Sequence, residues 1–282
     1  MRYTTFADQI ENRKESWRKF SSGIQRFVVG LGKKVLLANT CGLIADRAFE
    51  SVGDASAMLL WLGLVAYTLQ IYYDFSGYSD MPIGLGRMFG FEFPENFNYP
   101  YVSKSISEFW RRWHISLGTW FRDYVYFPLG GSRVATRRRL VFNLLVVWSL
   151  TGIWHGANWT FFAWGLLYFV LIAVEKVWRG FGGSLARSRV FGHAYTMFFV
   201  MMGWVVFRAD GMSQALAYYA GLFGLGGCSW MERRWSCSKR TSCPSLWPSC
   251  CACPCLVSCC PASPETRYLR GLPWPACSFF SS

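Results

Sequence analysis

The sequence predicts an all-α, polytopic integral membrane protein, a helical bundle that includes re-entrant and interfacial helices. Hydrophobic residues make up 52% of the chain and aromatic residues 19%, more than an ordinary soluble domain carries. Several stretches approach the roughly 20 apolar residues that cross a bilayer. Charged residues make up only 16% and gather between these stretches, as the basic loops of membrane proteins do.

The net charge of +13 comes from 29 basic and 16 acidic residues. A strongly basic balance is also typical of nucleic-acid-binding proteins. Because the basic residues separate apolar segments, we expect anionic membrane lipid, and no nucleic acid, as their partner. Residues 1–22 are polar and lack the apolar core of a signal peptide. The sequence therefore begins as though it were within a cytoplasmic loop.

The N-terminal part of the chain alternates polar and apolar stretches. Residues 2–22 predict an amphipathic helix at the membrane surface. Residues 23–46 are apolar but hold basic side chains, which favours a tilted or re-entrant helix. Residues 57–75 are the first good spanning segment and run into an irregular, Gly-rich stretch, whereas residues 91–104 hold two prolines and predict a loop.

The central part contains an interfacial helix and a hairpin. Residues 105–127 are aromatic and charged together, and Ser105 or Ser107 is positioned to cap a helix there. Residues 140–175 are too long for one simple span and predict two short spans with a break near Gly156. Both flanks of this stretch are basic and hold no acidic residue, so both belong on the cytoplasmic side.

The chain continues with a further span and then changes character. Residues 191–207 predict a span, and residues 213–225 begin another amphipathic or spanning segment, which brings the total to about five or six. We therefore expect a membrane domain over residues 1–227 and a separate Cys/Pro/Ser-rich tail over residues 228–282.

The tail holds ten of the eleven cysteines and seven of the eleven prolines. A metal-binding or disulfide-rich module is one interpretation, but the paired spacing of zinc sites is absent, and we expect no metal site. Palmitoylation of the cysteines is another. We favour a third, a frameshift in a GC-rich gene, because shifted Leu and Ala codons give Cys, Trp and Pro. The tail would then carry no evolved function.

Three histidines are present, and His155 is the strongest candidate for chemistry. It lies between two apolar arms, where a histidine costs free energy unless it is paired or faces a cavity. Asn158 is placed to hydrogen-bond the imidazole or a substrate oxygen. The alternative is a structural histidine that bonds a backbone carbonyl across helices, and the residues alone leave both open.

His114 and His193 are weaker candidates. His114 follows Arg111 and Arg112, which are suited to an anionic donor such as a phosphate or pantetheine group. The alternative is an interfacial helix with solvated arginines. His193, beside Gly192, is expected to be a surface loop residue.

Two acidic residues, Asp74 and Asp80, flank the Gly-rich stretch in an apolar setting. They favour either a proton or ion pathway or, as we prefer, a buried pair with a loop arginine, Lys33 or Lys34. No phosphate-binding glycine loop and no GxSxG elbow occurs, so nucleotide-binding and serine-hydrolase functions have no support.

Two long blocks resemble the MBOAT (membrane-bound O-acyltransferase) family. The first covers residues 72–131 and includes SEFWRRWHISLGTWFRDYVYFPLGG; the second is TGIWHGANWTFFAWG, residues 151–165. They are most similar to the branch that acetylates bacterial exopolysaccharides such as alginate, and more distantly to D-alanyl transfer proteins. The resemblance covers about residues 4 to 226 and implies an MBOAT-like helical bundle.

The resemblance also implies roles for residues. His155 matches the family's catalytic histidine, and His114 matches a second, more variable one. In the family an acyl group passes from a cytoplasmic thioester across the bacterial inner membrane, and for alginate it reaches periplasmic acetyltransferases. We therefore expect acetyl-CoA or another acyl thioester as donor, a polysaccharide acceptor and no bound cofactor. The imidazole acts as a base or as a nucleophile, and Trp154 and Trp159 supply apolar walls.

Two departures from the family pattern bear on activity. The family's N-terminal spans do not precede these blocks, and the tail stands where its C-terminal helices are expected. We therefore expect the isolated chain to fold poorly and to be inactive. Two rival functions are a transporter that uses Asp74, Asp80 and His155 as an ion or proton relay, and a non-catalytic membrane scaffold for periplasmic acetyltransferases.

Overall fold

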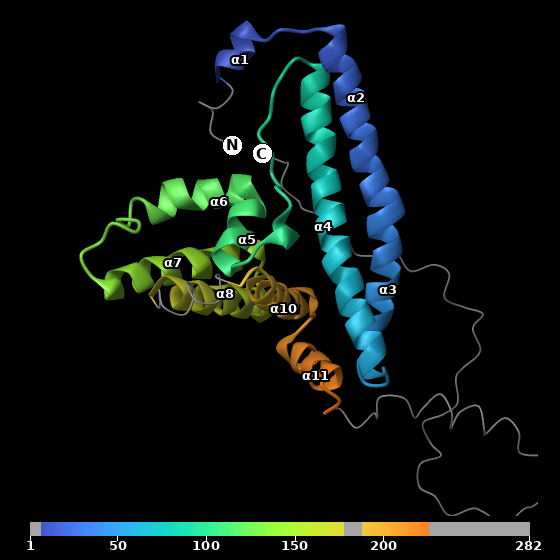
Figure 1. Ribbon diagram of the computed structural model, residues 1–282, viewed down its shortest axis with the longest axis vertical. Helices are drawn as coiled ribbons and strands as arrows, with labels where there is room; N and C mark the ends of the chain where they lie inside the picture. The colour runs from blue at the N-terminus through green and yellow to red at the C-terminus, as the bar shows by residue number, and fades with distance from the viewer. Residues whose placement is uncertain (1–6, 178–187, 226–282) are drawn as a thin grey trace, which may run out of the picture. The chain divides into compact units, whose positions relative to one another are not determined.

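The computed structural model describes residues 7–177 and 188–225, and in these residues all regular structure is helical (Figure 1). The predicted all-α class is confirmed, while the tail of residues 228–282 lies outside the described part. The elements are α1 (Ala7–Asn12), α2 (Trp17–Gly32), η2 (Lys33–Ala38), α3 (Asn39–Glu50), α4 (Ala57–Met88), η3 (Pro100–Val102), α5 (Ile106–Arg112), α6 (Ile115–Phe121), η4 (Arg122–Tyr126), α7 (Arg137–His155), α8 (Trp159–Val177), α10 (Arg189–Arg208) and α11 (Met212–Leu222).

Hydroxyl side chains mark where helices begin. In each case the side-chain oxygen accepts a hydrogen bond from a backbone N–H three residues further on, which satisfies a donor that the helix leaves free. These caps are Ser16, Ser56, Ser105, Thr136 and Ser188. The predicted cap at Ser105 is confirmed.

The first helices form one long antiparallel pair. The run α2–η2–α3 continues without a break from Trp17 to Glu50, and α4 lies alongside it (Figure 1). The 34 residues of the α2–η2–α3 run are long and apolar enough to cross a membrane. The helix expected over residues 23–46 is therefore confirmed, as part of this longer run. The expected surface helix over residues 2–22 is wrong in part, because α1 ends at Asn12 and α2 begins at Trp17.

Glycines bring the two members of this pair into backbone contact. A Cβ atom added at Gly77 would lie 2.6 Å from the carbonyl oxygen of Gly30, and one at Gly84 would lie 2.7 Å from that of Gly23. The expected irregular stretch after residue 75 is thus wrong, since α4 continues through it to Met88. These glycines serve close helix packing, not turns.

A second group consists of α7, α8 and α10, set across the α2–α4 pair in Figure 1. Helix α7 ends at His155, and Gly156 has a φ of 149°, which is accessible mainly to glycine. Helix α8 then returns alongside α7, so the predicted hairpin with a break near Gly156 is confirmed. Helices α8 and α10 also meet the length and hydropathy needed to cross a membrane. Together with the α2–α3 run, three such segments occur in the described residues, compared with the five or six expected.

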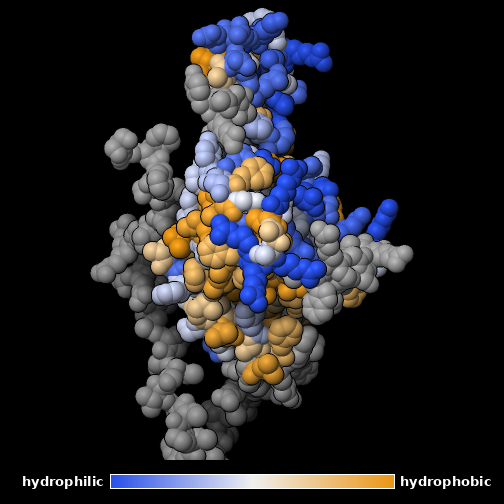
Figure 2. All heavy atoms as spheres, turned by 90° about the vertical axis from the view of Figure 1, so that its left-hand side faces the viewer, coloured by the Kyte–Doolittle hydropathy of each residue, from blue (hydrophilic) through white to orange (hydrophobic). Residues whose placement is uncertain are grey.

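An aromatic core lies where this group meets α4, α5 and α11. Its largest buried side chains include Trp164, Trp204, Tyr168, Tyr218 and Phe109. The surface is mixed: in Figure 2 the end that carries α1 is hydrophilic, and hydrophobic residues gather lower on the same face. A chain with an apolar exterior of this kind is suited to lipid or to further helices.

Two local expectations about the histidine segments are wrong. Residues 105–127 do not form one helix, because α5 ends at Arg112 and α6 begins at Ile115, with His114 between them in the left-handed region at φ 46°. His193 is not in a loop; it lies within α10, with Nδ1 3.2 Å from the carbonyl oxygen of Ser103.

Candidate active site

His155 occupies the tip of the α7–α8 hairpin, as the last residue of α7. Aromatic rings surround its imidazole edge to face, with centroids 4.9 Å away at Trp154, 5.0 Å at Trp164 and 5.1 Å at Phe207. Within residues 7–177 and 188–225, no hydrogen bond engages either ring nitrogen. The imidazole is therefore held in place by packing, and its nitrogens stay available for chemistry.

His114 lies near this tip, in the turn between α5 and α6. Its ring is 4.7 Å from that of Phe75 and 6.3 Å from that of Trp154, so Trp154 contacts both imidazoles. Burial, together with a smaller effect of the nearby His155, lowers the pKa of His114 to about 4. His114 is therefore neutral near pH 7 and can act as a hydrogen-bond acceptor or a base.

An asparagine that the sequence analysis missed binds His114. The Oδ1 atom of Asn96 lies 3.1 Å from Nδ1 of His114 and accepts hydrogen bonds from the backbone N–H and the hydroxyl of Ser116. Its Nδ2 donates to the hydroxyl of Ser79. Asn96 lies 18 residues before His114 in an irregular loop, where no periodic pattern points to it.

The two predicted arginines lie on α5. Both Nε and Nη2 of Arg112 donate to one carboxylate oxygen of Glu108, and its Nη1 donates to the carbonyl oxygen of Asn98. Arg111 is exposed and donates through Nε to the carbonyl oxygen of Ser107. The contacts of Arg112 thus lead to its own helix and to the neighbouring loop, and not to an imidazole.

The start of α5 is fixed from α8. The carboxylate of Glu175 accepts hydrogen bonds from the backbone N–H groups of Ile106 and Ser107, at 2.7 and 2.9 Å. A negative charge at a helix N-terminus is favourable. The far end of α8 therefore positions the helix that leads to His114.

Asn158 and Trp154 lie on either side of the tip. The Oδ1 atom of Asn158 accepts from the backbone N–H of Thr160, and its Nδ2 donates to the carbonyl oxygen of Asp210 at 2.9 Å. Trp154 is 56% exposed, so its contacts with both imidazoles leave much of the indole free. The structure thus gathers His114, His155 and Trp154, while Asn158 ties the turn to the loop after α10.

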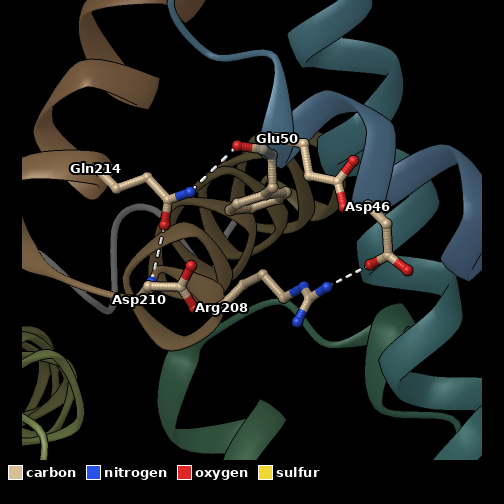
Figure 3. Close-up of a pocket in the computed structure, with 6 residues that line it drawn as sticks. Asp46, Glu50, Arg208, Asp210 and Gln214 are labelled. Atoms are coloured by element: carbon tan, nitrogen blue, oxygen red, sulfur yellow. Dashed lines mark hydrogen bonds and ion pairs between the residues drawn. The ribbon is translucent and has the colours of Figure 1, made fainter. Parts of the chain in front are cut away.

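Beyond Asp210 lies a polar pocket of about 120 Å³ at the ends of α3 and α10 and the start of α11 (Figure 3). Arg208 pairs with Asp46 and lies over the ring of Phe49. The Gln214 amide bridges α11 to both neighbours, donating to the Phe49 carbonyl and accepting from the Asp210 N–H. The pocket holds no histidine, and its bonds join three helix ends near the hairpin tip.

The acidic residues of α4 are ion-paired, which confirms the expected pairing, although the Asp74–Lys34 pair is partly exposed and only Asp80 is largely buried. Asp74 pairs with Lys34. Asp80 pairs with both Lys33 and Arg26, at 2.6 and 2.8 Å, and its side chain is only 14% exposed. These carboxylates hold α4 to the α2–η2 run.

Comparison with known proteins gives the family of the chain. Residues 1–213 match the MBOAT, membrane-bound O-acyltransferase, family. The chain belongs to this family. It is therefore a membrane protein, and the resemblance found in the two sequence blocks is confirmed.

Individual MBOAT relatives show how much of the family's length the chain represents. It is 46% identical over 226 residues to a probable alginate O-acetylase of Azotobacter vinelandii, covering 80% of this chain and 45% of the relative. It is 38% identical over 223 residues to a peptidoglycan O-acetyltransferase of Helicobacter pylori, covering 77% and 42%. A teichoic acid D-alanyltransferase of Bacillus subtilis is 28% identical over 183 residues, covering 61% and 46%. The chain thus spans less than half the length of these relatives.

Proposed function

We propose that this chain supplies the histidine-bearing core of a membrane O-acyltransferase. The enzyme would move an acetyl group from a cytoplasmic thioester, acetyl-CoA or another acyl donor, across the membrane for O-acetylation of an exopolysaccharide such as alginate. The observation that carries the proposal is His155 at the hairpin tip, packed by aromatic rings, with ring nitrogens that no described residue engages.

The chemistry needs one free imidazole nitrogen. As a base, His155 takes the proton of an attacking hydroxyl. The hydroxyl oxygen bonds to the thioester carbonyl carbon, the carbon–sulfur bond breaks, and the proton passes to the leaving thiolate. As a nucleophile, the nitrogen attacks the carbonyl carbon itself, and the carbon–sulfur bond breaks to release the thiolate. The hydroxyl oxygen then takes the acetyl group from the imidazole, and the hydroxyl proton passes to the thiolate. Both routes end in an ester and a free thiol.

We assign surrounding roles to four further residues. Trp154 contacts both imidazoles and would exclude water that hydrolyses the thioester. Arg111 and Arg112 would meet anionic groups of the donor, Arg111 directly from its exposed position. Asn158 would serve the acceptor at the tip, since its bond to Asp210 already fixes it beside the turn.

The charge pattern supports an orientation in the bacterial inner membrane. The N-terminal flank of α7 holds Arg137, Arg138 and Arg139, and α8 ends beside Lys176. Basic flanks prefer the cytoplasmic side, so the tip with His155 would project into the membrane or towards the far face of a multi-pass protein. Periplasmic acetyltransferases would then place the group on sugar hydroxyls.

The names of the relatives support acyl transfer to a polymer. Alginate, peptidoglycan and teichoic acid are all polymers, and two of the three relatives are named for acetyl transfer. The identity of 46% with the alginate enzyme, against 28% with the D-alanyl enzyme, favours acetyl and alginate. A relay for transport has less support, because Asp74 and Asp80 are ion-paired.

A graft tests the proposal. Residues 1–225 would replace the matching segment of the Azotobacter vinelandii relative, and the graft would be produced in an alginate-producing strain without its own O-acetylase. We expect the secreted alginate to regain acetyl esters. His155→Ala should lower the acetyl content by about 100-fold or more, since a positioned acid–base group contributes 10²- to 10⁴-fold.

His193→Ala is the matched control, because His193 lies on α10 and bonds only to Ser103 within the described residues. It should leave acetylation near that of the parent graft. Equal acetylation by the His155→Ala and parent grafts would contradict the proposal and support a non-catalytic scaffold.

A further inference from the structure

We propose that Asn96 is a positioning residue that fixes His114 as its Nδ1–H tautomer and leaves Nε2 as the free, proton-accepting nitrogen of the site. The inference rests on the proposed function for its catalytic meaning, but not for its geometry. Asn96 belongs to the loop between α4 and α5, and its backbone and side-chain oxygens bind the turn of residues 114–116.

The backbone of the turn is held first. His114 has φ 46° and ψ 55°, a left-handed conformation that residues other than glycine rarely adopt. The carbonyl oxygen of Asn96 accepts from the N–H of Ile115, and its side-chain Oδ1 accepts from the N–H of Ser116. Two bonds from one residue thus hold the turn open at His114, where a straight α5–α6 helix would otherwise continue.

The same bonds establish which amide atom faces the imidazole. The N–H of Ser116 can only donate, so the atom 3.2 Å from it must be the oxygen of Asn96 and not the nitrogen. On the opposite side, the amide nitrogen of Asn96 donates to Ser79 on α4. Turning the amide over would set two donors against each other, so the oxygen faces His114.

The tautomer of His114 follows from this orientation. Its Nδ1 lies 3.1 Å from the Asn96 oxygen, which can only accept, so Nδ1 must carry the proton. The Ser116 hydroxyl donates to the same oxygen at 2.9 Å and can itself accept from Nδ1–H at 3.3 Å. With Nδ1 used in this way, Nε2 holds the free electron pair. The arrangement matches the general role of a second group that orients a working histidine.

The free nitrogen is well placed for the chemistry of the site. The His114 ring lies edge to face against Phe75 on one side and near Trp154 on the other, and Trp154 also contacts His155. The unprotonated Nε2 of His114 can take the proton of the hydroxyl that is to be acetylated, or it can orient that hydroxyl towards His155. The opposite tautomer would present an N–H donor at Nε2 and could not take up that proton.

Nitrogen-15 NMR of the histidine side chains tests the inference on the folded fraction of the 282-residue chain, purified in lipid nanodiscs. The chain holds only three histidines, so His155→Gln and His193→Gln assign the His114 signals. At pH 7 we expect protonated Nδ1 and unprotonated Nε2 at His114. A protonated Nε2 in the unsubstituted chain would overturn the inference without any variant.

Three variants sharpen the test. Asn96→Leu should lose the fixed tautomer, whereas Asn96→Asp keeps an oxygen towards Nδ1 and should retain it. Asn98→Leu is the matched control: Asn98 is exposed in the same loop, and its described bonds are made by the backbone, so the tautomer should not change. Retention of the Nδ1–H tautomer in Asn96→Leu, with the other histidine signals unchanged, would also overturn the inference.

The graft separates this inference from the proposed function. There, Asn96→Leu should lower the acetylation rate by roughly 10- to 100-fold, as loss of an orienting partner typically does, and Asn96→Asp should restore most of it. If the His114 tautomer is fixed but the graft acetylates equally well with and without His155, the proposed function alone would be refuted. Full acetylation by Asn96→Leu, with acetylation still dependent on His155, would refute the role of Asn96 alone.

Discussion

The α2–α4 pair and the α7–α8 hairpin both place ionisable side chains among apolar helices, with different results. In the pair, Asp80 meets Arg26 and Lys33, and Asp74 meets Lys34, so each carboxylate is matched by a cation. In the hairpin, the imidazole of His155 packs against aromatic rings and forms no hydrogen bond with any described residue.

The packing of the two regions differs in the same way. Glycines let α2 and α4 approach backbone to backbone, which leaves little room for anything between them. The hairpin packs large rings around its tip, and Trp154 stays 56% exposed. Paired charges therefore mark the part that holds the fold, and the imidazole without a hydrogen bond marks the part for which we propose the chemistry.

The largest expected effect on stability comes from Asp80→Asn. Removing the carboxylate leaves Lys33 without its partner and leaves Arg26 with Glu95 alone, which should lower the free energy of unfolding by about 3 kcal/mol. Denaturant unfolding in detergent, followed by helix content, measures it. Glu92→Gln is the control: its pair with Lys19 is exposed and screened by solvent, so the change should leave the unfolding transition nearly where it is in the parent chain. Equal losses of unfolding free energy in both variants would show that the Asp80 pairs stabilise the fold no more than an exposed pair does.

Gly77→Ala should have a somewhat smaller effect. The added methyl group would lie 2.6 Å from the Gly30 carbonyl oxygen, and separating the helices should cost about 2 kcal/mol. Gly32→Ala is matched, because nothing lies within 4 Å of a Cβ there, and the change should stabilise the helix slightly. Similar melting temperatures for the two variants would show that α2 and α4 do not pack as described.

The smallest expected effect is a pH dependence due to His114. Its pKa is lowered to about 4 in the folded chain from an ordinary value near 6.5. Between these pH values the unfolded chain binds more protons, so stability falls as the pH is lowered from about 6.5 towards 4. The loss should be about 1 to 2 kcal/mol between pH 7 and 5, and His114→Gln should reduce it. An unchanged pH dependence in His114→Gln would contradict the burial of a neutral imidazole.

Local sequence patterns predicted the elements that depend on nearby residues. The cap at Ser105 and the hairpin break at Gly156 are set by local chemistry, so the sequence was sufficient for both. The pairing of Asp74 and Asp80 with lysines followed from the cost of a lone charge in an apolar setting. His155 stood out for the same reason.

The features that were missed depend on residues far along the chain. Taken alone in the sequence, Gly77 predicts a break in the helix. Its actual role, a close contact between two helices, depends on Gly30 in the facing helix. The left-handed turn at His114 is held by Asn96, 18 residues earlier, and α5 is capped by Glu175, 69 residues from Ile106. Periodicity carries no information about such partners.

The rate of thiol release from a labelled acetyl thioester most directly tests whether the unpaired imidazole is the reacting group. Membrane vesicles that contain the graft would be compared with His155→Ala and Asp80→Asn vesicles at equal amounts of folded protein. We expect His155→Ala to lower the rate by about 100-fold or more and Asp80→Asn to lower only the amount that folds. A His155→Ala rate equal to that of the parent graft, or a larger loss of rate in Asp80→Asn, would place the chemistry elsewhere.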